Sequence, residues 1–170
     1  MSTADQGLSH IPASEGESIL VMTDLVTVKV PSQATGGIFV LTEVITQPQG
    51  GPPMLHRHPD QETFYVLEGR FRFDMLQADQ PSSIEAVPGS VIHIPSMTWH
   101  NYQNIDTTSG KLLVVMQPGD MLDFFRELGI AVTDRTSLPQ PSGPPDMQRI
   151  MAITKKHQVE MRMPPPREQA

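Results

Sequence analysis

Short runs of β-branched, aliphatic and aromatic residues recur between Ser18 and Met116, and Gly, Pro, Asn or Asp residues separate them. The strand candidates are residues 18–22, 25–30, 37–46, 54–58, 62–67, 70–75, 83–87, 90–94, 98–103 and 111–116. Chains with many short strands and few helices form antiparallel sandwiches or barrels, because each strand must bury one face against a second layer. A small barrel also has an interior that can hold one ligand.

The composition changes along the chain in a way that predicts three parts. Residues 1–17 are polar and contain Gly, Ser and Pro, so we expect a flexible N-terminal arm. Residues 18–118 carry the strand candidates and form the barrel, and residues 119–170 form a helical C-terminal extension that packs on it. No internal repeat is evident, and a chain of 170 residues suits one hydrophobic core. A single barrel is therefore expected rather than a fused pair.

Two helices are predicted in the extension, at Met121–Leu128 and Met147–His157. The Asp120 carboxylate can accept hydrogen bonds from the free amides of the first helix, and Gly129 can end that helix in the left-handed conformation. The basic residues at the end of the second helix complement its dipole. The apolar residues expected to lay both helices over the barrel as a lid are Phe124, Phe125, Ile150 and Met151.

Four potential metal ligands occur in two short segments. Side chains alternate along a strand, so His56 and His58 point to the same face. The turn composition of residues 59–61 lets Glu62 return towards the same ion from the neighbouring strand, and His100 closes the site from the second segment. Three imidazoles and one carboxylate suit one divalent Fe, Mn, Co, Ni or Zn ion, and they leave coordination positions for water, substrate or dioxygen.

These positions resemble the two sequence motifs of the cupin superfamily. The first motif is matched at every defining position, by Gly50, His56, His58, Glu62 and Gly69. The second motif is matched by Gly89, Pro95, His100 and Asn104, whereas Met97 stands where a Gly is usual. The resemblance covers roughly residues 36 to 117. It implies an all-β fold, the cupin double-stranded β-helix or jelly-roll barrel, here with one or two C-terminal helices.

Among cupins, the chain resembles the single-domain, metal-dependent dioxygenases of the quercetinase type. That resemblance implies a small aromatic or enolic substrate, and it gives Glu62 two roles, as a metal ligand and as the acceptor of the substrate hydroxyl proton. Two alternatives remain. One is a metal-dependent lyase, isomerase or hydrolase acting on a small polar metabolite, and the other is a binding module without turnover. Dioxygen uptake with a substrate would distinguish the dioxygenase from both of these alternatives.

Strand alternation also predicts which side chains line the interior beside the metal ligands. The predicted substrate pocket consists of Met54, Phe64, Phe73, Met75 and Tyr102, with Phe124 and Phe125 above them. Such a cavity is mostly apolar and suits a planar aromatic molecule. Asn104 is expected to brace a loop rather than to contact the substrate.

Charge and composition narrow the classes of partner. The chain has 12 basic and 19 acidic residues, a formal charge of −7, which lacks the basic footprint of a nucleic-acid or anionic-membrane binder. It has no cysteine, so thiolate metal sites are excluded. No stretch reaches the roughly 18 apolar residues of a membrane span, and we expect a cytoplasmic protein. Exposed strand edges near the N-terminus, together with the family's habit, favour a homodimer formed by sheet extension.

Overall fold

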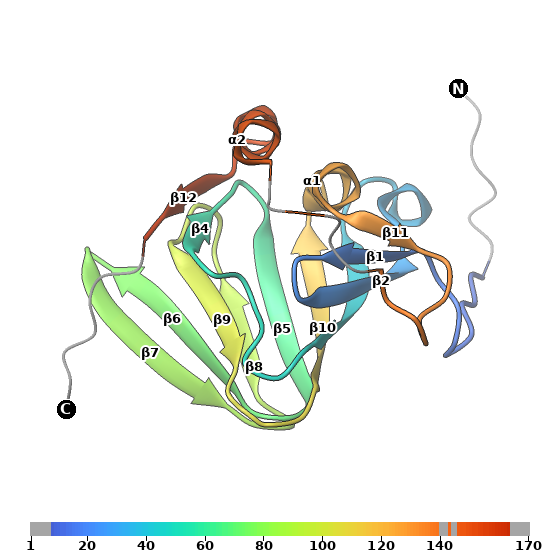
Figure 1. Ribbon diagram of the computed structural model, residues 1–170, viewed down its shortest axis with the longest axis horizontal. Coiled ribbons are helices and arrows are strands. Elements are labelled where there is room, and N and C mark those ends of the chain that lie inside the picture. The colour runs from blue at the N-terminus through green and yellow to red at the C-terminus, as the bar shows by residue number, and fades with distance from the viewer. Residues whose placement is uncertain (1–7, 140–142, 144–145, 164–170) are drawn as a thin grey trace.

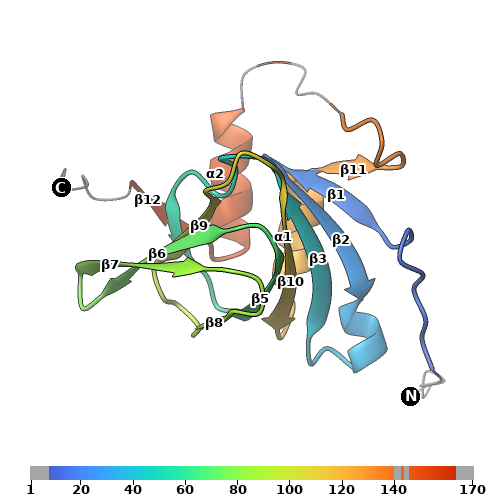
Figure 2. The same ribbon diagram turned by 90° about the horizontal axis from the view of Figure 1, so that it is seen from below.

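The computed structural model describes residues 8–139, 143 and 146–163, and its strands form two antiparallel sheets. The larger sheet contains, in spatial order, β11 (Ile130–Val132), β1 (Ser18–Val21), β2 (Asp24–Val30), β3 (Val40–Thr46), β10 (Gly110–Gln117), β5 (Gln61–Glu68) and β8 (Val91–Ile94). The smaller sheet contains β12 (Glu160–Arg162), β4 (Leu55–Arg57), β9 (His100–Asn104), β6 (Phe71–Gln77) and β7 (Gln80–Ala86). A 3₁₀ turn, η1 (Ser32–Thr35), joins β2 to β3. The two layers are seen in Figure 1 and, turned by 90°, in Figure 2.

The hydrophobic core lies between the two sheets and follows from alternation along the strands. Along β3 and β10 every second residue is buried, and along β5 Phe64 and Val66 face inwards. Phe73 of β6 meets Phe64 edge-on, with 5.2 Å between the ring centroids. Tyr102 of β9 packs on the same rings, 5.6 Å from Phe64 and 5.8 Å from Phe73. This two-layer packing confirms the predicted all-β jelly-roll fold.

Each predicted strand is present, and the C-terminal extension contains two more that the sequence did not reveal. β11 pairs with β1, with Ile19 opposite Ala131, and β12 pairs with β4, with His56 opposite Met161. Both strands have only three residues, too few for a periodic pattern to be recognised. The extension therefore adds one strand to each sheet. The expected exposed edge at β1 is wrong, because β11 covers it.

The extension also contains both predicted helices, α1 (Met121–Leu128) and α2 (Met147–Lys156), which lie above the sheets in Figure 1. The carboxylate of Asp146 accepts a hydrogen bond from the Arg149 amide at the start of α2, at 3.0 Å. The prediction that Met151 lies on the apolar face is wrong, since its side chain is 67 % exposed. Neither described helix has the length and apolarity needed to cross a membrane.

The predicted ends of α1 were both wrong. Asp120 makes no side-chain capping bond; instead the Asp60 carboxylate, from the loop before β5, accepts hydrogen bonds from the amides of Gly119 (2.9 Å) and Met121 (3.3 Å). Gly129 is extended, with φ −86° and ψ −172°, because the chain runs directly into β11. A Cβ at Gly129 would lie 2.6 Å from Ile19 Cγ2, so close approach rather than a left-handed turn requires glycine there.

Lys29 of β2 fixes the segment that precedes β1. The ammonium group of Lys29 donates to the carbonyls of Pro12 (3.2 Å), Ala13 (3.0 Å) and Glu15 (2.8 Å), which ties this part of the expected N-terminal arm to β2. The first seven residues of that arm lie outside the described residues.

Asn104 is fully buried at the end of β9. Its amide donates to the carbonyls of Thr46 (3.2 Å), Gln47 (3.2 Å) and Thr108 (2.8 Å), and its side-chain oxygen accepts from the amide of Asp106 (3.1 Å). The side chain thus braces the surrounding loops, as the sequence predicted.

Replacing Asp60 by Ala should destabilise the protein by about 2 kcal/mol, because two backbone amides at the start of α1 would lose a buried, charged acceptor. Asp120→Ala is the matched control. Asp120 is exposed and caps nothing, so its loss should cost less than about 0.5 kcal/mol. Denaturant unfolding of the three proteins measures both values. Equal losses in the two variants would contradict the role given to Asp60.

Candidate metal centre and adjoining cavity

Three imidazoles meet at one end of the smaller sheet. β4 and β9 place His56 directly opposite His100, and His58 follows one residue after β4. The ring centroids lie 4.3 Å apart for His56 and His100, 5.4 Å for His58 and His100, and 5.7 Å for His56 and His58. One nitrogen from each ring lies within 4.8 Å of the other two. The three histidines are therefore close enough to bind one metal ion.

Glu62 reaches the same place from the other sheet. Its Oε2 atom lies 3.1 Å from His100 Nε2 and 3.7 Å from His58 Nε2. The expectation that Glu62 comes from the strand next to His56 is wrong, because the neighbours of β4 are β9 and β12, whereas β5 lies in the seven-stranded sheet. The structure thus brings the four predicted side chains together across the gap between the sheets. Their role as a complete ligand set stays a prediction.

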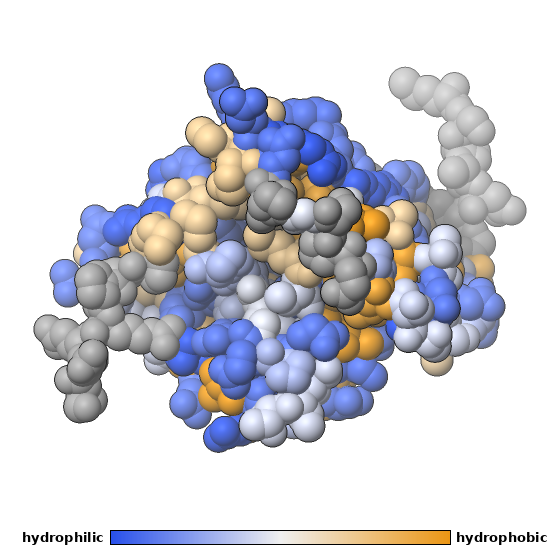
Figure 3. Space-filling view, viewed as in Figure 1, coloured by the Kyte–Doolittle hydropathy of each residue, from blue (hydrophilic) through white to orange (hydrophobic). Residues whose placement is uncertain are grey.

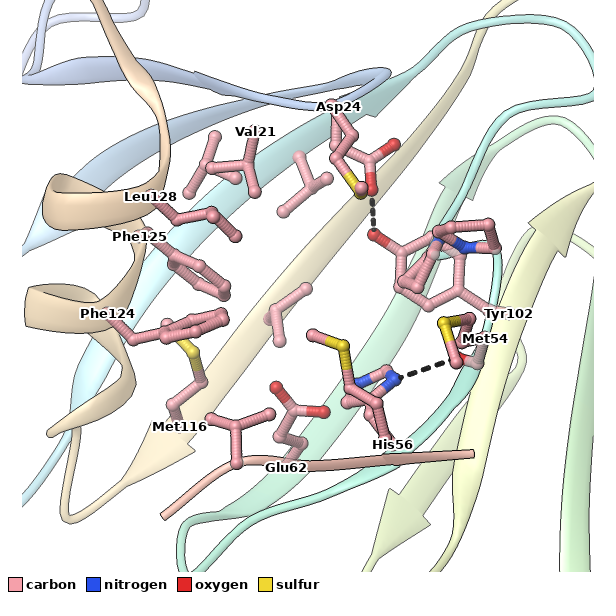
Figure 4. Close-up of a pocket in the computed structure, with 18 of the residues that line it drawn as sticks. Val21, Asp24, Met54, His56, Glu62, Tyr102, Met116, Phe124, Phe125 and Leu128 are labelled. Carbon is pink, nitrogen blue, oxygen red and sulfur yellow. Dashed lines mark hydrogen bonds between the residues drawn. The ribbon is translucent and has the colours of Figure 1, made fainter. Parts of the chain in front are cut away.

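Backbone carbonyls orient two of the imidazoles. His56 Nδ1 lies 3.3 Å from the Met54 carbonyl oxygen, a bond drawn in Figure 4, and His100 Nδ1 lies 2.8 Å from the Thr98 carbonyl oxygen. A carbonyl only accepts hydrogen bonds, so Nδ1 of each of these rings carries a proton, and Nε2 of the neutral His56 ring keeps a free lone pair. His100 Nε2 donates to the Glu62 carboxylate at 3.1 Å, and a metal ion bound there would replace that proton. Metal-ligating histidines in proteins are commonly oriented in this way.

His58 gives the strongest sign that a metal ion fits here. Its side chain is 1 % exposed, and neither ring nitrogen has a hydrogen-bond partner, since 3.7 Å to Glu62 is too long for a bond. Leaving a buried polar atom unpaired is costly, and such atoms in native proteins usually bind something. A divalent ion at Nε2 would satisfy the ring, and imidazole with carboxylate suits Fe, Mn, Co, Ni or Zn.

The protonation states suit a cation as well. Burial, helped by the nearby His100, lowers the pKa of His56 to about 3, so this ring is neutral at neutral pH. Burial raises the pKa of Glu62, but His58 and His100 outweigh it and hold that pKa well below its usual range. Burial lowers the pKa of His58, and Glu62 outweighs burial and raises it. Since a metal must displace the proton of His58, binding should weaken as pH falls.

A cavity of about 290 Å³ adjoins the cluster. It lies between the larger sheet, both helices and β12, and His56 and Glu62 form part of its wall (Figure 4). Five of the seven predicted pocket residues lie on the wall, namely Met54, Phe64, Tyr102, Phe124 and Phe125. Phe73 and Met75 do not line it. Both belong to β6, which lies one strand further from β4 than β9 does, and Phe73 is enclosed in the core.

Several residues of the cavity wall were not predicted from the sequence. Val114 and Met116 could have been found, because β10 alternates and its inner face continues that of β3. Met161 could not, since β12 gave no periodic signal. Asp24 could not either, because a carboxylate at the start of an apolar strand reads as a solvent-exposed end. Figure 3 shows apolar surface over α2 and β12, where Met147 and Met161 are 59 % and 39 % exposed and also border the cavity.

Asp24 forms the second carboxylate of the cavity wall. Its Oδ2 accepts a hydrogen bond of 2.6 Å from the Tyr102 hydroxyl, whereas its Oδ1 is buried without a partner (Figure 4). Burial raises the pKa of Asp24 to about 6, although the bond from Tyr102 opposes that change. The side chain is therefore an ionised, nearly buried acceptor at neutral pH.

The second motif departs from the usual pattern at Met97. Its φ is 57°, in the left-handed region that glycine adopts without strain. The Met97 amide donates to the carbonyl of His58 at 2.9 Å, so the turn supports a predicted ligand. The side chain is 40 % exposed and does not line the cavity.

Comparison with known proteins agrees with the arrangement of these motifs. Residues 42–116 match the family model described as "Cupin domain". The chain belongs to the cupins. A curated relative, "Quercetin 2,3-dioxygenase" of Bacillus subtilis (strain 168), is 31 % identical over 120 residues, which is 70 % of this chain and 34 % of that enzyme. This cupin chain thus spans about a third of the length of the curated relative it matches.

Solved structures show the same fold. A "predicted oxalate decarboxylase" from Thermotoga maritima aligns with a TM-score of 0.56 and 14 % identity, over 64 % of this cupin and 98 % of that chain. The oxalate decarboxylase of Lactobacillus farciminis, in a formate complex, aligns with a TM-score of 0.52 and 22 % identity, over 59 % and 30 % of the two chains. At such identities these matches establish the shared cupin fold alone.

Adding a divalent ion to metal-free protein should raise its unfolding temperature, because only the folded protein gathers the three imidazoles. An ion at a hundredfold its Kd stabilises by about 2.7 kcal/mol. His58→Ala should remove most of that shift. His93→Ala is the control, because His93 is exposed and lies 2.9 Å from the Thr63 hydroxyl, outside the cluster. Equal shifts in wild type and His58→Ala would exclude this cluster as the binding site.

Asp24→Asn should stabilise the protein at neutral pH. The pKa of Asp24 is about 6 in the folded protein, against an ordinary value of 3.8. This difference corresponds to about 3 kcal/mol that opposes folding above about pH 6 and vanishes below about pH 4. The advantage of the variant should therefore grow between about pH 4 and pH 7.5, as denaturant unfolding would measure. Other titrating groups, Tyr102 and Glu62 included, are common to both proteins, so an advantage independent of pH would refute the assignment.

Proposed function

We propose that this cupin is a metal-dependent dioxygenase that acts on a small hydroxylated aromatic or enolic molecule, as the likeness to quercetin 2,3-dioxygenase suggests. The observation that carries the proposal is the apolar cavity whose wall includes His56 and Glu62. When both atoms of dioxygen enter one substrate with cleavage of its carbon–carbon bonds, the substrate supplies all four electrons, so such a reaction needs no external reductant.

The cavity wall selects the class of substrate. Its described residues include two carboxylates, Asp24 and Glu62, and no Lys or Arg, while most of the others are aliphatic, aromatic or Met side chains. Away from the metal ion, an anionic group of the substrate would meet Asp24 with no Lys or Arg on the described wall to compensate its charge. The volume of about 290 Å³ lies at the lower limit for small-molecule sites and suits a few fused or linked rings.

His56, His58, Glu62 and His100 would hold the metal ion. When bound, the ion would act as a Lewis acid that orients a substrate oxygen and lowers its pKa. Of these four side chains, His58 and His100 do not line the cavity, whereas the Glu62 carboxylate does. Glu62 is thus the acceptor that a substrate hydroxyl would meet on entering, and the O–H proton would pass to its carboxylate oxygen.

The main alternative, a lyase or isomerase on a small polar metabolite, fits the cavity less well. The fold neighbours named oxalate decarboxylases act, by their names, on a small dianion. Beyond the metal ion, an oxalate-like dianion would face an apolar wall and the Asp24 carboxylate, with no Lys or Arg among the described wall residues. The same argument disfavours a module that binds small anions without turnover.

A homodimer is proposed on a different surface from the one first expected, because β1 is not an edge. The outer face of the larger sheet carries Tyr65, Leu67 and Val91, which are 43 %, 37 % and 57 % exposed. Burying these side chains would favour association of two copies. Light scattering at micromolar concentration should give the mass of a dimer, and Val91→Lys should give a monomer.

Glu62→Gln should keep much of the metal and lose turnover by about 10²- to 10⁴-fold, because the amide cannot accept the substrate proton. The metal content of the purified variant and its dioxygen uptake with a flavonol measure the two effects separately. Glu68→Gln is the matched control, since Glu68 lies on the same strand, is exposed and pairs with Lys111 at 3.3 Å. If metal and activity fall in parallel in Glu62→Gln, Glu62 is only a ligand.

A further inference from the structure

The cavity has a polar group at each of two separated places, and only one of them belongs to the candidate metal centre. Glu62 lies on β5, whereas Asp24 lies on β2, three strands away in the order β2-β3-β10-β5. Figure 4 shows Asp24 on the opposite side of the cavity from Glu62 and His56. Between them the wall is mostly apolar, with Val26, Val44 and Val114 among its residues.

The fold accounts for only one oxygen of the Asp24 carboxylate. The Tyr102 hydroxyl donates to Oδ2, and this bond joins β9 of one sheet to β2 of the other. The other oxygen, Oδ1, has no hydrogen-bond partner, although the residue is buried, with only 7 % of its surface exposed. A neutral acceptor such as Asn would suffice to hold Tyr102. A buried charge with a free oxygen stabilises nothing by itself and disfavours folding.

The neighbouring polar groups do not remove this deficit. Thr46 is paired with Asp24 in the β2–β3 ladder, and its hydroxyl and that of Thr23 lie near enough to lower the pKa of Asp24. Neither hydroxyl has the geometry of a hydrogen bond to Oδ1, and Oδ1 is left without a partner. An unpaired carboxylate oxygen of a residue on a cavity wall is typical of a place where a bound molecule completes the hydrogen bonds.

We propose that Asp24 Oδ1 accepts a hydrogen bond from a hydroxyl group at the end of the substrate remote from the metal centre. This inference rests on the proposed function and narrows its substrate class to an elongated aromatic molecule with hydroxyl groups at both ends. One end presents its oxygen to Glu62 and the metal, and the other end donates to Asp24. Tyr102 is a positioning residue that holds the carboxylate through Oδ2.

The chemistry of a carboxylate makes this a selective contact. An ionised carboxylate only accepts hydrogen bonds, so a hydroxyl is favoured over a methyl ether, a carbonyl or an anion at the same place. Sites built to bond a substrate hydroxyl strongly reject analogues without it, because the buried group is then left unpaired. Hydrogen bonds to charged groups change affinity by about tenfold to a hundredfold.

The test compares two flavonols, one with a hydroxyl on the ring remote from its enol oxygen and the other with that hydroxyl methylated. Binding to the metal-loaded full chain is measured without dioxygen, so that turnover does not enter. Wild type should bind the hydroxylated compound at least tenfold more tightly than the ether. Asp24→Asn should bring the two affinities to within about twofold, because its amide can also donate to the ether oxygen.

Asp123→Asn is the control for loss of one charge, because Asp123 is exposed on α1 and bonded to Arg126. It should keep the wild-type preference. Equal affinities in wild type, an unchanged preference in Asp24→Asn, or binding of neither compound would overturn the inference. The wild-type comparison needs no substitution, so it decides the question even if the variant does not fold.

Dioxygen uptake measured on the same samples separates this inference from the proposed function. Selective binding without dioxygen uptake would refute the dioxygenase and leave the role of Asp24 standing. Dioxygen uptake with equal affinity for both flavonols would support the dioxygenase and refute the role of Asp24.

Discussion

The contact between Glu62 and the imidazoles of His58 and His100 joins the two sheets, and the remaining features of the site depend on it. Glu62 belongs to the seven-stranded sheet, and His100 to the five-stranded one. The sheets must therefore approach each other at this end, while the volume that the core does not fill remains as the cavity. Asp60, two residues before Glu62, holds the first amides of α1, so the helix over the cavity is fixed to the same loop.

Sequence motifs predicted which side chains would meet, but not which strands and sheets would bring them together. Alternation shows which face of a strand a residue occupies and says nothing about which strand lies opposite. For this reason His56, His58 and His100 were placed together correctly, whereas Glu62 was assigned to the wrong neighbour and Phe73 to the cavity instead of the core. The two three-residue strands were missed because they are held by pairing with β1 and β4 rather than by their own pattern.

The charged groups of the described cavity wall are confined to two separated places, with mostly apolar side chains between them. An apolar wall orients nothing by itself, because hydrophobic contact is insensitive to rotation of the ligand. Carboxylates lie at two separated places on the wall, Glu62 and Asp24, and would supply the orientation that the apolar wall lacks. The Tyr102 hydroxyl then serves both the architecture, by joining β9 to β2, and the cavity, by holding the Asp24 carboxylate.

The pairing of β12 with β4 bears on how the protein matures as it is synthesised. His56, His58, Glu62 and His100 all leave the ribosome before residues 147–162, which supply α2, β12 and part of the cavity wall. Until Met161 pairs with His56, β4 has an unpaired edge and the nascent centre is accessible from that side. The smaller sheet is therefore completed only by the pairing of β12, after the strands that carry the four side chains have been synthesised.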